Sequence, residues 1–150
     1  MRMIPFWPRL LGFAGLLPQA AAVAVAYAGP SHWVSDAKAL GALYAALIVT
    51  FLGGAWWGIA ASAPAAERRG TLGWLWIAAV LPSLLAFGLL GTSVLGQLDV
   101  EPVLVMLGAG LLIALGVDAR LAGLAPAWWL RLRVPLSVLL GSATIALALA

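Results

Sequence analysis

The chain has 150 residues, of which 65% are hydrophobic and 9% are charged, against roughly 25% charged residues in an average soluble domain. This composition excludes a water-soluble fold of this size and predicts an integral membrane protein. The net charge of +3 comes from arginines scattered between apolar segments, which form no basic face for nucleic acid, and the absence of cysteine excludes disulfides and thiolate metal sites.

The predicted fold is all-α, a single transmembrane domain over residues 1–150 with about five spanning helices. The predicted helices cover residues 10–28, 39–63, 72–90, 102–117 and 134–150. Strands are disfavoured because the segments are continuously apolar rather than alternating. The first segment follows arginines as a signal peptide would. It lacks a small-residue cleavage site, so we expect a retained span.

The cations predict the orientation of the bundle. One side would carry Arg2, Arg9, Arg68, Arg69, Arg120, Arg131 and Arg133. The other side would carry only Lys38, together with Asp36, Asp99 and Glu101. By the positive-inside rule the N-terminus is cytoplasmic and the C-terminus outside. With short loops and no long organellar presequence, the pattern indicates a multi-pass protein of the bacterial inner membrane.

In residues 10–28, Pro18 removes one helix hydrogen bond at mid-membrane and is followed by Gln19. An amide at this depth is costly unless it is paired, so Gln19 should face the bundle. Pro82 and Ser83 repeat this proline–polar pattern in residues 72–90. We expect the two kinked helices to pack together and to share hydrogen bonds through Gln19 and Ser83, with Thr50 as a further partner. A faint parallel repeat, as transporters use, is the alternative.

The stretch FLGGAWWG in residues 39–63 predicts close helix contact. Gly54 and Gly58 share one helix face with Ser62, a small-xxx-small pattern that lets two backbones approach in lipid. Trp57 follows Gly53 by one turn and is expected to lie across the space that this glycine leaves empty. A direct ligand role for this stretch is the alternative.

Asp118 is the most notable ionisable group, because it ends residues 102–117 beside Arg120. With the last two helices antiparallel, we expect Asp118 to meet Arg131 in an interfacial ion pair. A proton relay or a lipid-headgroup site is the alternative. Seven of the eight tryptophans fall near the cytoplasmic ends, where an aromatic belt is expected.

The segment WWLRLR places aromatic rings beside cations at the predicted cytoplasmic surface. Trp128, Trp129, Arg131 and Arg133 could together hold an anionic lipid headgroup. The single histidine, His32, lies in an external loop with Asp36 and is expected to be solvated, since a metal site needs three or four ligands. No residue set for catalysis, cofactor or metal binding is predicted.

FLGGAWWG, AVLPSLLAF, Asp118 and LAPAWWLRLRVPLS follow one another in an order that resembles a family of small bacterial membrane proteins without an assigned function. A mitochondrial transmembrane protein of animals belongs to this family. The resemblance spans about residues 10–137 and implies a multi-pass inner-membrane protein. The chain departs from the family pattern at Trp56, Phe87 and Trp129, where a basic residue or histidine, another aromatic residue and tyrosine are usual.

The leading functional hypothesis is an accessory or assembly subunit that works through helix contacts, with a membrane-protein partner or as a homo-oligomer. The second is a binder or carrier of a small amphipathic molecule, such as a quinone, haem or lipid. Its site would lie at the cytoplasmic Trp/Arg rim and the proline-kinked helices 10–28 and 72–90. A transporter or enzyme that uses Asp118 and Gln19 is the third. A large apolar cavity that opens between helices 10–28 and 72–90 would favour the second hypothesis. A solid core with an exposed Gly54/Gly58 groove would favour the first.

Overall fold

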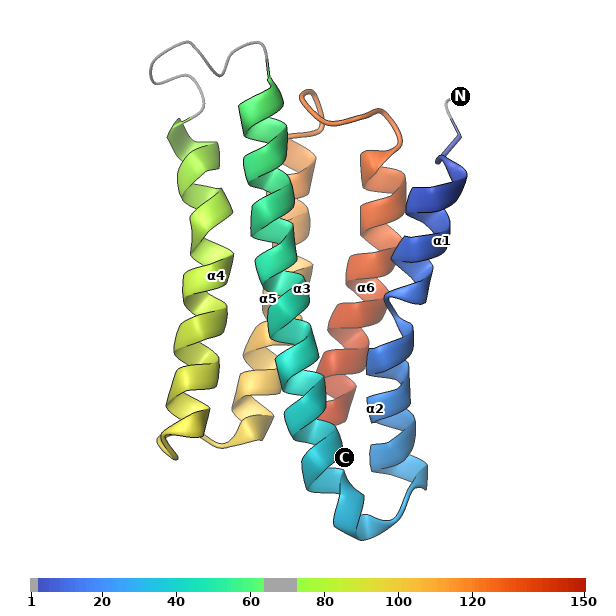
Figure 1. The fold of residues 1–150 in the computed structure, drawn as a ribbon, viewed down its shortest axis with the longest axis vertical. Coiled ribbons are helices and arrows are strands. Elements are labelled where there is room, and N and C mark those ends of the chain that lie inside the picture. The colour runs from blue at the N-terminus through green and yellow to red at the C-terminus, as the bar shows by residue number, and fades with distance from the viewer. Residues whose placement is uncertain (1–2, 64–72) are drawn as a thin grey trace.

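The computed structural model describes residues 3–63 and 73–150, and all regular structure in this part of the chain is helical (Figure 1). Arg2, Arg68, Arg69 and residue 72, the predicted start of the third helix, lie outside the described residues. The helices are α1 (Phe6–Ala14), α2 (Leu17–Ala28), the short 3-10 helix η1 (Ser31–Trp33), α3 (Val34–Ser62), α4 (Gly73–Val94), α5 (Val100–Arg120) and α6 (Trp129–Ala148).

Five helical segments of the described chain are long and apolar enough to cross a membrane, as the sequence predicted. They are Phe6–Ala28, Ser31–Ser62, Gly73–Val94, Val100–Arg120 and Trp129–Ala148. The two chain ends lie at opposite ends of the bundle in Figure 1, as an odd number of spans requires. The protein is therefore an all-α, multi-pass membrane protein, and the side on which each end lies stays a prediction.

The last four spans begin or end beyond the predicted apolar segments. In α3, α5 and α6 the added turns carry charged residues, some of which pair inside the bundle, whereas the added turn of α4 is uncharged. Lys38 in α3 donates to Glu101 in α5 over 2.9 Å, and the lysine is only 9% exposed. A predicted apolar segment ends where the first charged residue occurs in the sequence. The helix itself can continue past that residue when the charge is paired within the bundle. This pair ties α3 to α5 at the end opposite to the N-terminus.

The first span is two helices rather than one, with a break at Gly15 and Leu16. Pro18 therefore lies in the first turn of α2, where its missing N–H is not needed. The Tyr44 hydroxyl of α3 donates to the Gly15 carbonyl that the break leaves free. No residue of α1 is buried, and this helix packs mainly against α6. It is thus the most loosely attached wall of the bundle.

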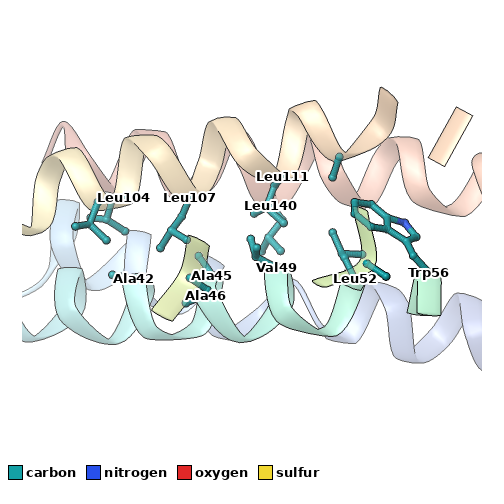
Figure 2. Close-up of a cluster of buried hydrophobic side chains, with 14 of the residues drawn as sticks. Ala42, Ala45, Ala46, Val49, Leu52, Trp56, Leu104, Leu107, Leu111 and Leu140 are labelled. Atoms are coloured by element: carbon teal, nitrogen blue, oxygen red, sulfur yellow. The ribbon is translucent and has the colours of Figure 1, made fainter. Parts of the chain in front are cut away.

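The core runs along α3, which contacts α2, α4, α5 and α6. Figure 2 shows the small face of α3, which includes Ala42, Ala45 and Ala46, against leucines of α5 and α6. Alanines let the helix axes approach, and the leucines fill the remaining space. The large exposed side chains, such as Phe87 and Ile113, point away from this core. This arrangement suits a bundle surrounded by lipid.

Glycines allow two closer helix contacts. A Cβ at Gly53 would overlap the Ala79 carbonyl oxygen of α4, so only glycine fits there. Between α5 and α6, a Cβ at Gly108 would lie 2.8 Å from the Gly141 carbonyl oxygen, and one at Gly141 would lie 3.0 Å from the Gly108 oxygen. Backbone therefore meets backbone at both crossings.

Candidate functional site

The Asp118 carboxylate is fully buried near the end of α5, where three helices meet. Trp56 of α3 and Trp129 of α6 donate their indole N–H groups to its Oδ1, over 2.9 and 3.0 Å. Arg133 of α6 donates its Nε–H to Oδ2 over 2.9 Å. Both oxygens are thus hydrogen-bonded, and the negative charge meets a positive one. This carboxylate joins α3, α5 and α6.

The arginine in this ion pair is Arg133, which corrects the expectation of Arg131. Trp129, Arg133 and Ser137 follow one another at intervals of four and so share the inner face of α6. Arg133 Nη2 donates to Ser137 Oγ over 2.8 Å, and its guanidinium carbon lies 6.0 Å from the Trp129 ring centroid. Arg131 is two residues away on an exposed face.

We call Trp56, Asp118, Trp129, Arg133 and Ser137 the Asp118 cluster. Its single anion and single cation lie in contact, so the net charge of the cluster is zero. The indole donors reduce the cost of burying the carboxylate. Arg120, which the sequence placed beside Asp118, is exposed at the end of the same helix.

A pocket of about 330 Å³ opens beside the cluster, between α1, α3 and α6. Its floor is formed by buried leucines of α3, α5 and α6, and its rim includes the exposed Leu11 and Phe51. Arg133 and Ser137 line it as well, and of the described residues that line it only Arg133 is ionisable. We call it the Arg133 pocket. It lies against the helices of the first, second and fifth spans, not between the first and third as expected.

Two other hollows have a different character. A hollow of about 230 Å³ between α3, α4 and α5 is lined by apolar side chains, Trp56 among them, and by no ionisable residue within 3–63 and 73–150. The larger hollow between α2 and α3, about 560 Å³, has two ionisable residues among the described residues that line it, the exposed Asp36 and the half-buried Tyr44. Of these three hollows, only the Arg133 pocket has a buried ionisable side chain in its wall. Its volume falls at the small end of the range for ligand sites, roughly 300–1,000 Å³.

Gln19 is fully buried, as predicted, but its partner differs from the expectation. Its Nε2 donates to Thr144 Oγ1 of α6 over 3.1 Å, and Thr144 donates to the Leu140 carbonyl over 2.7 Å. Ser83 belongs to α4, which lies across the bundle from α2 (Figure 1). The two proline-bearing helices therefore do not pack together as expected, and Pro82 is buried against α3 instead.

The FLGGAWWG stretch divides between the inside and the outside of the bundle. Gly53 is buried against α4, whereas a Cβ added at Gly54 or Gly58 would meet no described atom within 4 Å beyond the adjacent turns of its own helix. Trp57 does not cover Gly53, because α4 occupies that space. Its ring meets the edge of Trp76, with 4.7 Å between the centroids. The stretch thus packs Gly53 and Trp56 inside the bundle and leaves the face of Gly54 and Gly58 open.

Sequence reasoning did not assign Trp56, Ser137 or Thr144 to these polar contacts. Ser137 and Thr144 share the inner face of α6 with Arg133 and Gly141, and small or polar residues in a membrane helix favour a bundle-facing position. That pattern was available in the sequence. Trp56 carried no comparable signal. It and Trp129 both donate to Asp118.

Comparison with curated proteins gave no match for this chain, and comparison with solved structures also gave none. One protein family does match, described as a protein of unknown function (DUF3429), and the match covers residues 4–149. It therefore includes every helix of the bundle and all residues of the Asp118 cluster. The chain belongs to the DUF3429 family.

Proposed function

We propose that the protein binds a small amphipathic molecule from the membrane in the Arg133 pocket. The observation that carries this proposal is the pairing of a hollow on the bundle surface with buried polar groups at its wall. Ligand sites are mostly apolar and contain a few polar groups that fix orientation. Ser137, 1% exposed, and Arg133, 7% exposed, supply such groups here.

Access to the pocket supports the same function. Leu11 and Phe51 at its rim are both exposed, so the hollow opens on the surface that faces lipid. α1 forms one wall without burying any residue of its own. A molecule that moves within the bilayer could therefore enter sideways. The protein would hold or carry it at the end of the bundle that the arginines predict to be cytoplasmic, in a bacterial inner membrane.

Filling the pocket tests this function. Ala55 lines it, whereas Ala61 lies on the same helix, is exposed and does not line it. The wild type, Ala55→Phe and Ala61→Phe would be purified in mild detergent, and the co-purified molecules identified by mass spectrometry. We expect one amphipathic molecule at close to one per chain with the wild type and Ala61→Phe, and its loss with Ala55→Phe. No such molecule on the wild type would contradict the proposal.

A second candidate function is contact with a membrane-protein partner, the accessory role first favoured by the sequence. Its support is the open face at Gly54 and Gly58, which no part of the described chain covers. A photo-crosslinking residue at Gly54 should then capture one protein in fixed ratio, and the same residue at the exposed Ile113 of α5 should not. Equal capture at both positions would contradict this role.

A further inference from the structure

We infer that the Arg133 pocket selects an uncharged, hydrogen-bond-accepting head, such as a ring or ester carbonyl, over an anionic phosphate or carboxylate. This inference rests on the proposed function, because it names the chemical class of the molecule that the pocket holds. The charges at the pocket wall favour an uncharged head. Among the described residues, Arg133 is the only ionisable one that lines the pocket, and its cation is already paired with Asp118 over 2.9 Å.

An anionic head would therefore be placed beside a pair whose charges cancel. Asp118 is fully buried, so water screens its negative charge poorly. The anion would lose its own hydration without gaining an unpaired cation, and burial of such a charge is strongly unfavourable. A neutral carbonyl loses far less hydration. The Asp118–Arg133 ion pair thus disfavours the binding of anions in the pocket, whereas an unpaired arginine would favour it.

The hydrogen-bond donors at the pocket wall favour a head that carries acceptors. A guanidinium has five N–H donors and no acceptor. The described bonds of Arg133 use Nε for Asp118 and one N–H of Nη2 for Ser137. The remaining N–H groups give this end of the pocket donor capacity, and the Ser137 hydroxyl, which accepts from Arg133, keeps its own proton to donate. A ligand head should then contribute acceptors, as a carbonyl oxygen does.

The lining and the volume of the pocket disfavour haem and a diacyl lipid, two of the molecules that the sequence left open. In the part of the chain that the structure describes, no histidine, methionine, cysteine or tyrosine lines the pocket, and these are the residues that hold haem iron. A hollow of about 330 Å³ is also at the small end for a ligand site, which suits one head with the start of one chain better than a diacyl lipid. Quinones and single-chain esters fit both limits.

The test compares probes of equal chain length on the full-length protein in phosphatidylcholine nanodiscs. The probes are a decyl benzoquinone, a decanoyl monoglyceride and decyl phosphate. Binding would be measured by calorimetry for the wild type, Ala55→Phe and Ala61→Phe. We expect at least one neutral probe to bind the wild type and Ala61→Phe more tightly than decyl phosphate by about tenfold or more, and Ala55→Phe to lose that binding. Whether the quinone or the ester binds tighter identifies the source of the carbonyl.

The outcomes separate the two claims. If decyl phosphate binds as tightly as the neutral probes or tighter, and Ala55→Phe abolishes this binding, the pocket binds an amphiphile but the inference is overturned. If no probe responds to Ala55→Phe, both the inference and the proposed function fail. Asp118→Asn adds a check, since it leaves Arg133 uncompensated and should shift preference toward decyl phosphate. Salt gives a second measurement if that variant does not fold: wild-type binding of the neutral probe should not weaken with salt.

Discussion

Asp118 is held by three N–H donors from two helices and lies out of reach of water. Its ion pair with Arg133 offsets the burial of two charges, and the pair as a whole contributes little net stability compared with apolar residues of the same volume. Removal of one partner is different, because the other then keeps an uncompensated charge in a dry environment. The Asp118 cluster thus fixes how α3, α5 and α6 are positioned relative to one another, and it adds little to the free energy of unfolding.

Asp118→Asn should lower the free energy of unfolding by about 3–5 kcal/mol, since Arg133 is left unpaired. The double variant Asp118→Leu/Arg133→Met should recover most of this loss, because neither charge remains. Denaturation in mixed detergent micelles measures all members of the mutant cycle. A stability of Asp118→Asn equal to the wild type would show that the buried pair does not form.

Gln19 and Thr144 should respond asymmetrically to substitution. The Gln19 Oε1 atom has no hydrogen-bond partner among the described residues, and Thr144 keeps its bond to the Leu140 carbonyl without Gln19. Gln19→Met should therefore be nearly neutral. Thr144→Val should cost about 1–3 kcal/mol, because the whole buried amide is then unpaired. The same micelle denaturation would measure both, and equal losses would contradict the described bonding.

At this scale the sequence predicted which groups are buried better than it predicted their partners. Gln19 and Asp118 were expected inside because polar groups in lipid need partners. Their partners depend on the rotation of each helix, and Arg131 and Arg133 differ by two residues, which is more than half a turn. The series Arg133, Ser137, Gly141 and Thr144 indicates the inner face of α6 and would have selected Arg133.

At the scale of helices, close contact depends on single glycines rather than on the whole small-xxx-small motif. Gly53 and Gly54 are adjacent in α3, yet Gly53 meets the α4 backbone and Gly54 meets no other described helix. The spacing of small residues cannot tell which face of a helix meets its own chain. The structure resolves this, because α4 crosses α3 on the Gly53 side.

Gly53→Ala should weaken the α3–α4 contact and destabilise the protein by about 1–3 kcal/mol, because its Cβ overlaps the Ala79 carbonyl oxygen. Gly54→Ala is the matched control and should leave the unfolding free energy unchanged or slightly higher. Unfolding in mixed micelles measures both variants. Equal effects of the two substitutions would contradict the described packing.

The number and placement of spans were the most predictable part of the fold, because continuous apolar segments leave helices as the only solution. The helix ends and the break at Gly15 were not predicted. The ends depend on charge pairs such as Lys38–Glu101, which join residues far apart in the chain. The break depends on Pro18 starting a helix rather than kinking one, and both outcomes are open to a proline.

At the scale of the whole molecule, the loops before α3 and before α6 should lie on opposite sides of the membrane. The chain has no cysteine, so Ser31→Cys and Ala127→Cys each introduce a single exposed thiol. A membrane-impermeant maleimide should label Ser31→Cys in intact cells and Ala127→Cys only after lysis. Labelling of both from outside would contradict the five-span topology, and the reverse pattern would contradict the predicted orientation.

The central claim is that a small amphipathic molecule occupies the Arg133 pocket in the native membrane. The most direct measurement places a photo-crosslinking residue at Phe51, on the pocket rim, or at the exposed Phe87 of α4 as control. Membranes are irradiated before any detergent is added, and the intact chain is weighed by mass spectrometry. We predict one adduct of a single small mass at position 51 and a mixture of bulk phospholipids at position 87. The same phospholipid mixture at both positions would contradict the claim.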